Sequence, residues 1–491
     1  MCGIFATTGG DAPKETLKHR GPDMYSEVHI KNHKLLFWRL AINGLKNGMQ
    51  PFELDGKYLV ANAEIYNHLD LGGKRGQSDC QVILEMIKIF GIYKACNMFC
   101  GDFAFVFTDG KTIWAARDRV GVRPLFYCRH PDGIAFASEA KALLHYKTRI
   151  EHFPPGHLYD SSFDKFVCWK SNYWEPSHID TCDDLFGYLH LAVDRRLSST
   201  EVPVGFFLSG GLDSSIIAAL GKNILGGRIR TFSIGLADSP DLLAARKMAN
   251  FLDSDHTEVV FTPEEGLAVI EDVIWHLESF DTTTVRASIP MFLLSKYIKD
   301  NTDIRVVLSG EGSDELFGGY LYFHGAPDSD ALAGETTRLV NDVHMFDVLR
   351  ADRTTSAHGI ELRVPFFDTD LIDYVMGQFD PSLKMPTEGY EKYILRKTFE
   401  LILPHDIAWR QKNGMSDAVG YAWRETLKEF GEYQYQDIFH LQFGCNMHLV
   451  PYMWMPKWTD ADDPSATQLK YFKDSLRPVE ENHSEIPSDS S

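Results

Sequence analysis

Residues 202–224 have the sequence VPVGFFLSGGLDSSIIAALGKNI. An apolar run at 202–208 is followed by the loop 209–215, SGGLDSS, and then by an apolar segment at 216–224. This order predicts a buried strand, a glycine-rich turn and a helix. Glycines at such a turn let backbone N–H groups point inward, and the helix N-terminus favours negative charge. The stretch therefore predicts a phosphate-binding loop on a parallel sheet.

The same rhythm of strand, loop and helix continues on both sides of this stretch. A helix is predicted at 185–196, and further strands are predicted at 231–234, 256–261 and 305–308. The last of these strands runs into a second loop of small and acidic residues, SGEGSDE, and a later helix is predicted at 391–402. Strands that alternate with helices predict a doubly wound parallel sheet.

The first 165 residues show a different pattern. Short apolar stretches at 34–37, 58–61, 103–107, 113–116 and 134–137 alternate with Gly, Asp and Asn turns. Only one helix is clear, at 79–90, where Val82, Ile83, Met86, Ile87 and Phe90 fall on one face. Many short strands with few helices predict a sandwich of antiparallel sheets.

These patterns divide the chain into four parts. We predict a sandwich domain over 1–165, a linker over 166–183, an α/β domain over 184–470 and a tail over 471–491. The tail is rich in Pro, Ser, Glu and Asp, and we expect it to be disordered. The expected fold class is an α+β sandwich of antiparallel sheets followed by an α/β doubly wound parallel-sheet domain.

The composition excludes several classes of protein. Hydrophobic residues make up 44% and charged residues 24% of the 491 residues, which is usual for globular domains. The formal net charge is −20, so a broad nucleic-acid-binding surface is not expected. No apolar run approaches about 20 residues and no signal-peptide pattern opens the chain, so we expect no membrane segment. The eight cysteines lack zinc-ligand spacing and disulfide density, which predicts a reduced, cytoplasmic protein.

Cys2 is the cysteine that carries a specific prediction. Removal of Met1 would leave a thiol and a free α-amine on one residue, and the amine can serve as base for its own thiol. This pairing explains why a nucleophile stands at the start of a mature chain. A terminal cysteine of no consequence is the alternative reading of this position taken alone.

A series of short motifs follows Cys2 in order. They are MCGIF at 1–5, HRGPD at 19–23, RLAI at 39–42, QP at 50–51, NAEIYN at 62–67, SDC at 78–80, GDFAF at 101–105, RD at 117–118 and ASEAKAL at 137–143. The series resembles the class II glutamine amidotransferases over the whole first domain. The resemblance implies a fold of the N-terminal nucleophile type, in which Cys2 attacks the side-chain amide of glutamine and releases ammonia.

The same resemblance assigns the glutamine site. Asn62 and the backbone N–H of Ala63 form the oxyanion hole for the tetrahedral intermediate. Arg39 pairs with the α-carboxylate of glutamine, and Asp79 and Glu64 hold its α-ammonium and amide groups. The implied glutamine-binding set is Arg39, Leu40, Ala41, Ile42, Asn43, Asn62, Ala63, Glu64 and Asp79.

Three departures from the pattern of that family occur. Ala63 stands where glycine is usual, Phe37 and Trp38 precede Arg39 where His-Glu is usual, and Gln81 stands where glutamate is usual. A left-handed backbone at Ala63 would be strained by about 1 kcal/mol, whereas a negative φ keeps the backbone donor in place. These departures predict slower glutaminase turnover without its loss.

The loop 209–215 predicts a cradle for pyrophosphate. Its glycines and serines supply donors, but no Gly-Lys-Ser/Thr closes it, so it is not a Walker A loop. Asp213 is an acid among phosphate donors, which favours Mg²⁺ between the two. The less specific reading is a glycine-rich turn with an N-cap serine.

Further motifs follow this loop in order. They are TFSIGL at 231–236, SPD at 239–241, TTVRAS at 283–288, LSGEGSDE at 308–315, FGGY at 317–320, GIELRVPF at 359–366, AWRQK at 408–412 and YMWMPKW at 452–458. The loop resembles that of ATP pyrophosphatases, and the whole chain resembles glutamine-hydrolysing asparagine synthetases. Relative to many members, a peripheral stretch is missing before the last motif.

The resemblance implies ATP-dependent synthesis of asparagine. The β-carboxylate of aspartate attacks the α-phosphorus of ATP, and ammonia then displaces AMP from β-aspartyl-AMP. Glu311 is the candidate base for the incoming ammonia, and Asp314 is the partner of the aspartate amine. The implied ATP and pyrophosphate set is Leu208, Ser209, Gly210, Gly211, Asp213, Ser214, Ser215, Ile234, Arg286, Ser309, Gly310 and Lys412. Asp213 is the metal ligand of this set.

Two alternative functions stay open at this stage. One is another ligase on the same scaffold, such as a β-lactam synthetase, but those enzymes lack the nucleophile that Cys2 provides. The other is an ammonia-dependent synthetase, or a regulatory binding protein, with a glutaminase site impaired by Ala63, Gln81 or a retained Met1.

The expected partners are the small molecules aspartate, glutamine and ATP. Neither nucleic acid nor a membrane is expected, and a homodimer is one option for the assembly. Because ammonium is not a nucleophile, we also expect an internal apolar passage for ammonia between the two sites.

Overall fold

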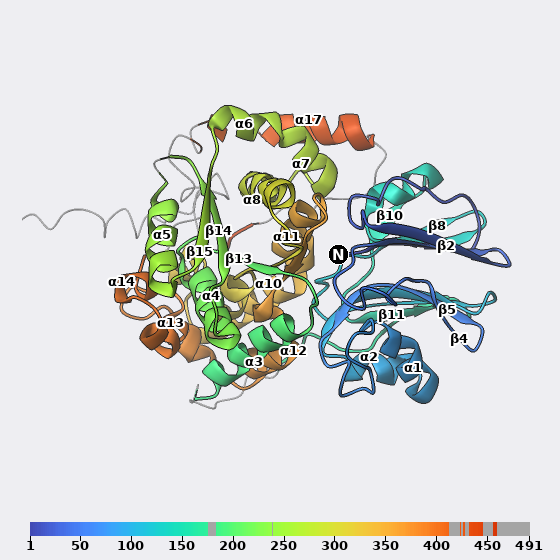
Figure 1. The fold of residues 1–491 in the computed structure, drawn as a ribbon, viewed down its shortest axis with the longest axis horizontal. Coiled ribbons are helices and arrows are strands. Elements are labelled where there is room, and N and C mark those ends of the chain that lie inside the picture. Colours follow the sequence, from blue (N-terminus) through green and yellow to red (C-terminus); the bar gives the residue numbers. More distant parts are fainter. Residues whose placement is uncertain are drawn as a thin grey trace, which may run out of the picture.

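The computed structural model describes residues 1–174, 183–237, 239–411, 423, 426–427, 432–444 and 455–458. This part of the chain holds two antiparallel six-stranded sheets and one parallel five-stranded sheet. The antiparallel sheets come first and are stacked on each other, and the parallel sheet follows (Figure 1), so the expected fold class is confirmed. We call residues 1–168 the sandwich and residues 185–408 the parallel-sheet half. The predicted tail at 471–491 lies outside the described residues.

Two sheets make up the sandwich. The strands of the first are β1 (Gly3–Thr7), β2 (Met24–Ile30), β3 (His33–Arg39), β8 (Phe126–His130), β9 (Gly133–Ala137) and β10 (Ile150–His152). Their order is β10-β8-β9-β1-β3-β2. The strands of the second are β4 (Phe52–Leu54), β5 (Lys57–Ile65), β6 (Gly101–Thr108), β7 (Ile113–Arg117), β11 (His157–Asp160) and β12 (Lys165–Cys168). Their order is β12-β11-β7-β6-β5-β4, and all five apolar stretches predicted as strands lie in these sheets.

The two sheets pack face to face. The buried residues between them include Ile4, Phe37, Val60, Val106 and Phe136. Helices α1 (Gln81–Phe90) and α2 (Ile92–Met98) cover the outer face of the second sheet, and the 3₁₀ helix η1 (Ala140–Tyr146) covers that of the first. Helix α1 confirms the predicted helix at 79–90 and begins two residues later than expected.

The parallel-sheet half alternates strands with helices. Its strands are β13 (Val204–Phe207), β14 (Arg230–Gly235), β15 (Asp255–Val260), β16 (Val306–Leu308) and β17 (Glu361–Arg363), in the order β15-β14-β13-β16-β17. Its longer helices are α3 (Leu185–Ser198), α4 (Leu212–Leu225), α5 (Pro240–Leu252), α7 (Ile270–Leu277), α8 (Thr282–Asn301), α10 (Ser329–Asp342), α11 (Asp347–Ser356) and α12 (Thr369–Gly377). Helix α5 lies on one side of the sheet and α8 on the other (Figure 1). This is the doubly wound arrangement expected from the sequence.

The predicted elements of this half are confirmed with shifts at their ends. Helix α4 begins at Leu212, four residues before the predicted helix, because Gly211 already serves as its N-cap. The predicted helix at 391–402 is shorter in the structure, where α13 (Tyr393–Phe399) passes into a 3₁₀ turn. Strand β17 was not predicted from the sequence.

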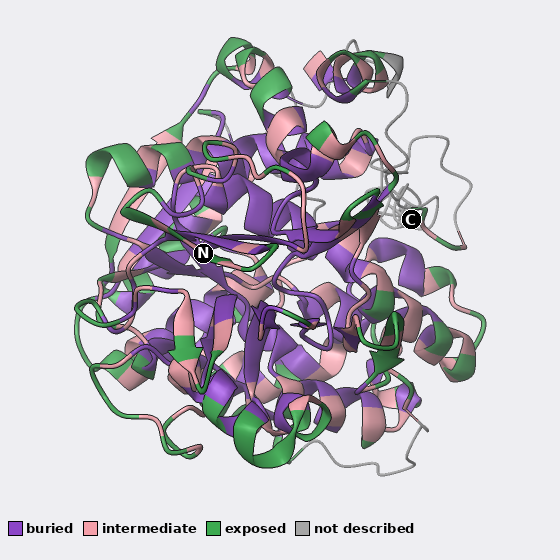
Figure 2. Ribbon diagram, turned by 90° about the vertical axis from the view of Figure 1, so that its right-hand side faces the viewer, coloured by how far each residue is buried: buried purple, intermediate pink, exposed green. Residues whose placement is uncertain are grey.

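A single apolar cluster joins the sandwich to the parallel-sheet half. It contains Met1, Leu40, Ile42, Val120 and Val122 from the first part together with the buried residues of the parallel sheet. The strands around the N-terminus are largely buried, and exposed residues gather on the outer helices and loops (Figure 2). Among the described residues, no helix has the length and apolar character needed to cross a membrane.

Candidate functional site

Cys2 lies immediately before β1, which runs between β9 and β3 in the first sheet. Its Sγ lies 3.8 Å from the carbonyl oxygen of Leu40, and Arg20 Nε donates to the Cys2 carbonyl oxygen at 3.2 Å. Burial raises the pKa of the Cys2 thiol, so formation of the thiolate needs a nearby base. The Met1 α-amine lies 3.4 Å from Glu361 Oε2, and burial lowers the pKa of this amine.

Asn62 and Ala63 lie near the end of β5, which packs against β1 across the sandwich. Asn62 is 1% exposed, and its Nδ2 has no hydrogen-bond partner among the described residues. A buried donor without a partner is destabilising unless a ligand uses it, so this amide suits an oxyanion. Ala63 pairs with Phe103 as an extended strand residue and does not have a positive φ. The left-handed strain that the sequence left open at Ala63 is therefore absent.

This geometry changes the expectation for the Ala63→Gly variant. Since Ala63 is already extended, glycine relieves no strain, and we expect glutaminase kcat/KM to stay within about twofold of the unchanged protein. Steady-state glutamine hydrolysis by the two proteins checks this. A rise of tenfold or more in the variant would restore the strain argument.

Arg39 is the last residue of β3, and its side chain is hydrogen-bonded to the loop that follows the strand. Its guanidinium donates to the carbonyl oxygens of Asn43, Gly44 and Leu45 at 3.2, 2.8 and 3.3 Å. These acceptors are neutral, so the positive charge of Arg39 stays available for a carboxylate. Next to it, Ala41 N donates to an Asp23 carboxylate oxygen at 2.8 Å.

Glu64 and Asp79 are buried beside this loop. Asn43 Nδ2 donates to Glu64 Oε2 at 2.9 Å, and the backbone N–H of Ile65 donates to Asp79 Oδ2 at 2.6 Å. Burial raises the pKa of both carboxyl groups. Glu64 also accepts from Arg363 of the parallel-sheet half at 2.8 Å. The structure thus gathers the predicted glutamine-binding residues around one loop, and Glu64 links that loop to the other half.

Two of the departures from the family pattern have structural explanations. Phe37 and Trp38 are buried in the sandwich, 1% and 2% exposed. Gln81 begins α1, and its side-chain amide donates to the carbonyl oxygen of Asn47 at 3.4 Å. Gln81 therefore donates a hydrogen bond to the same loop to which Arg39 is hydrogen-bonded.

The predicted phosphate loop connects β13 to α4 at the carboxyl end of the parallel sheet. Gly210 has a φ of 72°, and a side chain there would come within 2.4 Å of the backbone of Ala244. Ser209 Oγ and Ser214 Oγ lie 3.0 Å apart and face the loop. The second loop, after β16, meets the first where Ser313 Oγ donates to Asp213 Oδ1 at 2.7 Å. Two predicted ligand loops therefore converge, as is general for sites on parallel sheets.

Lys392 lies between these loops and was not predicted as a site residue. Its Nζ lies 2.7 Å from each carboxylate oxygen of Asp213 and 2.6 Å from Asp314 Oδ1. The side chain is 1% exposed, and the residue has a φ of 54° at the N-cap of α13. A buried ammonium thus supplies the counter-charge that the sequence assigned to Mg²⁺.

Glu311 lies in the loop after β16. Arg350 NH2, from α11, donates to Glu311 Oε2 at 2.9 Å and to Asp347 Oδ1 at 2.6 Å. Burial raises the pKa of Glu311 to about 7, although Arg350 opposes the shift. A carboxyl group that titrates near neutral pH is suited to proton transfer at that pH.

The other residues predicted to bind the nucleotide lie on different elements, and one of them lies outside the described residues. Leu208 and Ile234 lie at the ends of neighbouring strands, and the backbone N–H of Ser309 donates to the carbonyl oxygen of Arg363 at 3.1 Å. Arg286 is buried on α8, and its NH2 donates to the carbonyl oxygen of Leu427 at 3.0 Å. Lys412 lies outside the described residues. The roles of these residues toward ATP stay predictions.

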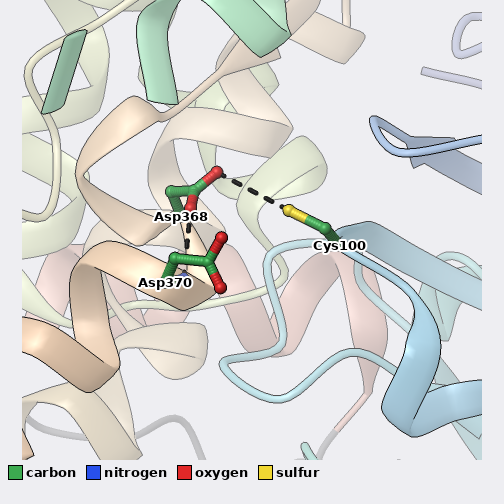
Figure 3. A group of neighbouring side chains, drawn as sticks. All are labelled: Cys100, Asp368 and Asp370. Atoms are coloured by element: carbon green, nitrogen blue, oxygen red, sulfur yellow. Dashed lines mark hydrogen bonds between the residues drawn. The ribbon is translucent and has the colours of Figure 1, made fainter. Parts of the chain in front are cut away.

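One other cluster has the residue types of a metal site. Cys100, Asp368 and Asp370 approach one another where the sandwich meets α12 (Figure 3). Arg195 NH1 contacts both carboxylates, at 3.0 and 2.7 Å, and Arg196 NH1 contacts Asp368 at 2.9 Å. Because two arginines already neutralise these acids, the cluster is an ion-pair network within the parallel-sheet half that Cys100 of the sandwich contacts, rather than a cation site.

Comparison with known proteins identifies the family of the chain. A family model described as "Glutamine amidotransferase domain" matches residues 1–168, and one described as "Asparagine synthase" matches residues 187–340 and 326–442. Asparagine synthetase [glutamine-hydrolyzing] of Rattus norvegicus is 38% identical over 563 residues, covering 97% of this chain and 100% of the relative. The protein of the same description from Homo sapiens is 37% identical, with the same coverage. The chain belongs to the glutamine-hydrolysing asparagine synthetase family.

A solved structure was also similar. The glutamine phosphoribosylpyrophosphate amidotransferase of B. subtilis has 20% sequence identity and a TM-score of 0.31, and the match covers 47% of this chain and 65% of that chain. The alignments with asparagine synthetases span more positions than the 491 residues of this chain, so those relatives carry segments that it lacks. This agrees with the missing peripheral stretch expected from the sequence.

Three residues that contact the candidate sites of this asparagine synthetase family member were not predicted as site residues from the sequence. They are Lys392 between the two loops, Arg350 on Glu311 and Arg363 on Glu64. Arg363 lies inside a motif that supported the resemblance, but nothing in its neighbourhood along the chain shows that it pairs with the glutamine site. The family membership also sets aside the regulatory-protein reading.

Proposed function

We propose that the chain makes asparagine from aspartate, with glutamine as nitrogen donor and ATP as the source of activation. The observation that carries this proposal is the similarity to asparagine synthetases over 97% of the chain, with candidate residues gathered at two sites. The boundaries 1–165, 166–183 and 184–470 are our proposal for the glutaminase domain, linker and synthetase domain. A cytoplasmic location and a homodimer also stay predictions.

The glutaminase reaction would take place at Cys2. The thiolate Sγ attacks the amide carbon of glutamine, the C–N bond breaks, and ammonia leaves with a proton from the base. Water then hydrolyses the thioester to glutamate and restores the thiol. The Asn62 Nδ2 donor and the N–H of Ala63 would hold the oxyanion, and Arg39 the α-carboxylate. After removal of Met1, the Cys2 α-amine would be the base.

The synthetase reaction would take place where the two loops meet. A β-carboxylate oxygen of aspartate attacks the α-phosphorus of ATP, and pyrophosphate leaves. The nitrogen of ammonia then attacks the acyl carbon of β-aspartyl-AMP, the bond to AMP breaks, and a proton passes to Glu311. This site contains a cluster of charged side chains, in which Lys392 contacts Asp213 and Asp314.

The predicted Mg²⁺ at Asp213 does not fit this arrangement. Both carboxylate oxygens of Asp213 accept from Lys392, and Oδ1 also accepts from Ser313. An ion bound directly to Asp213 would have to displace the ammonium group. We therefore assign the charge balance at this point to Lys392 and derive no step through a metal.

An apolar route for ammonia is compatible with the packing. Cys2 packs against the cluster that holds Leu40, Ile42, Val120 and Val122 and continues into the parallel sheet beside Leu308. Apolar side chains would keep ammonia unprotonated between the two sites. This passage stays a proposal.

The test of the function is product formation from aspartate, ATP and MgCl₂ with glutamine or with ammonium chloride. Asparagine, AMP and pyrophosphate with both nitrogen sources are expected. Asparagine with ammonium alone would place the failure at the Cys2 site, and no asparagine with either source would contradict the proposal.

A pH profile tests the role of Glu311. The carboxylate must be ionised to accept the proton, and burial raises its pKa to about 7. At constant free ammonia, the rate of ammonia-dependent synthesis should therefore rise from pH 6 to pH 8 with a midpoint near 7. The Glu311→Gln variant should be slower by about 100-fold and should lose this inflection. An unchanged midpoint in the variant would assign the titration to another group.

A further inference from the structure

Helix α11 crosses the side of the parallel-sheet half that faces the sandwich, close to the N-terminus of the chain (Figure 1). Every residue from Val348 to Ser356 is buried, including the charged side chains of Arg350, Asp352 and Arg353. Buried charges are unfavourable unless they are paired, so the partners of these residues show what the helix holds in place.

Asp352 and Ser356 lie one turn apart on α11, and both bind the same arginine of the sandwich. Arg20 NH1 donates to Asp352 Oδ2 at 2.8 Å and to Ser356 Oγ at 3.0 Å, and Arg20 NH2 donates to Asp352 Oδ1 at 3.0 Å. Arg20 is 0% exposed and Asp352 is 3% exposed. A two-point contact of this kind fixes the plane of the guanidinium as well as its position.

The remaining nitrogen of Arg20, Nε, is hydrogen-bonded to the backbone of Cys2, the candidate nucleophile. Arg20 Nε donates to the carbonyl oxygen of Cys2 at 3.2 Å, and NH1 also donates to Glu139 Oε1 at 2.8 Å. The guanidinium therefore contacts Cys2 through Nε and α11 through NH1 and NH2.

We propose that Asp352 is a positioning residue for the glutaminase reaction, supplied to the Cys2 site by the parallel-sheet half. Through Arg20 it fixes the Cys2 backbone and, with it, the direction in which Sγ approaches the amide carbon. The inference rests on the proposed glutamine hydrolysis at Cys2. A displacement of about 1 Å at a reacting group can cost about 100-fold in rate. Loss of the Arg20–Asp352 hydrogen bonds should therefore cause a measurable fall in the rate of glutamine hydrolysis.

The same contacts would also exist if they only held the two halves together. Glu139 binds Arg353 of α11 at 2.8 Å, and Arg353 binds Glu278 at 3.1 Å, so Asp352 is part of a larger buried network. A purely cohesive role would lower stability and both reactions together. A positioning role lowers the kcat of glutamine hydrolysis and spares synthesis from ammonia.

The experiment compares Asp352→Asn and Asp352→Glu with the unchanged protein. For Asp352→Asn we expect glutaminase kcat to fall by about tenfold, with the glutamine KM and ammonia-dependent synthesis within about twofold. Asp352→Glu, which keeps the carboxylate, should recover part of the loss. The control is Asp373→Asn, which removes the Arg119–Asp373 pair between the same two halves without a contact to Cys2 and should leave every rate unchanged.

Ser356→Ala keeps the inference testable if Asp352→Asn does not fold. It removes one neutral acceptor of Arg20 with little change in shape, and we expect a two- to threefold fall in glutaminase kcat alone. Glutaminase rates equal to those of the unchanged protein in both variants would overturn the inference. Equal losses with glutamine and ammonia, together with a lower Tm, would overturn it too. If the unchanged protein did not hydrolyse glutamine, the proposed function itself would fail.

Discussion

The Lys392→Met variant should lose asparagine synthesis by about 100-fold or more with either nitrogen source. The Lys392 side chain is 1% exposed, and its Nζ lies 2.7 Å from Asp213 and 2.6 Å from Asp314. Without the ammonium group, two carboxylates would face each other at the point where we propose that the phosphates of ATP bind. The variant should therefore bind and activate ATP poorly, which synthesis of AMP and pyrophosphate measures directly.

Lys384 provides the matched control for this variant. It is a second buried lysine of the parallel-sheet half, and among the described residues its Nζ contacts Met376 Sδ at 3.3 Å rather than a carboxylate. Burial lowers the pKa of Lys384 to about 7, so in an assay at pH 8 methionine at this position removes little charge. Lys384→Met should keep synthesis within about twofold and should not lower the Tm. Equal losses in both variants would mean that Lys392 acts through folding.

Glutamine hydrolysis by Lys392→Met separates the two sites. Cys2 lies in the sandwich, and no described contact joins it to Lys392, so glutaminase kcat should stay within about twofold of the unchanged protein. A comparable loss of glutaminase activity would contradict the assignment of Lys392 to the ATP site.

The sequence predicts the fold well where strands are apolar and flanked by turns. The central strands of the parallel sheet are continuous apolar runs, and the loops after them contain glycine, so both the elements and their order follow from local pattern. Strand β17 escaped prediction because only its middle residue, Leu362, is apolar. Glu361 and Arg363 are buried there through ion pairs with Met1, Arg123 and Glu64, which come from distant parts of the chain.

Some residues of the candidate sites could also be predicted from local sequence motifs, and others could not. Residues such as Cys2 and Asp213 stand inside ordered motifs, so the sequence alone could propose them as site residues. Lys392 lies 179 residues from Asp213 along the chain, and a lysine beside a predicted helix ordinarily indicates an exposed charge. Its burial depends on two acids contributed by other loops. Pairings over such separations arise from the fold and leave no local pattern in the sequence.

Asn62 is the residue at which loss of function and loss of stability should separate most clearly. In most buried polar residues, removal of the side chain breaks hydrogen bonds and destabilises the fold. The Nδ2 of Asn62 is buried and has no partner among the described residues, so an apolar side chain of similar shape removes an unsatisfied donor. The Asn62→Leu variant should therefore have a free energy of unfolding equal to or higher than that of the unchanged protein.

Its glutaminase reaction should nevertheless be slow. Loss of one oxyanion-hole donor costs about 100- to 1,000-fold in kcat, because the donor acts on charge that develops only in the tetrahedral intermediate. Ammonia-dependent synthesis should stay within about twofold, since Asn62 lies in β5 of the sandwich and the loops proposed to bind ATP lie in the other half. Chemical denaturation and rates with both nitrogen sources measure these quantities on one preparation. A destabilised variant that loses both reactions would show that the Asn62 amide is structural, and glutaminase kcat within a few-fold of normal would remove it from the oxyanion hole.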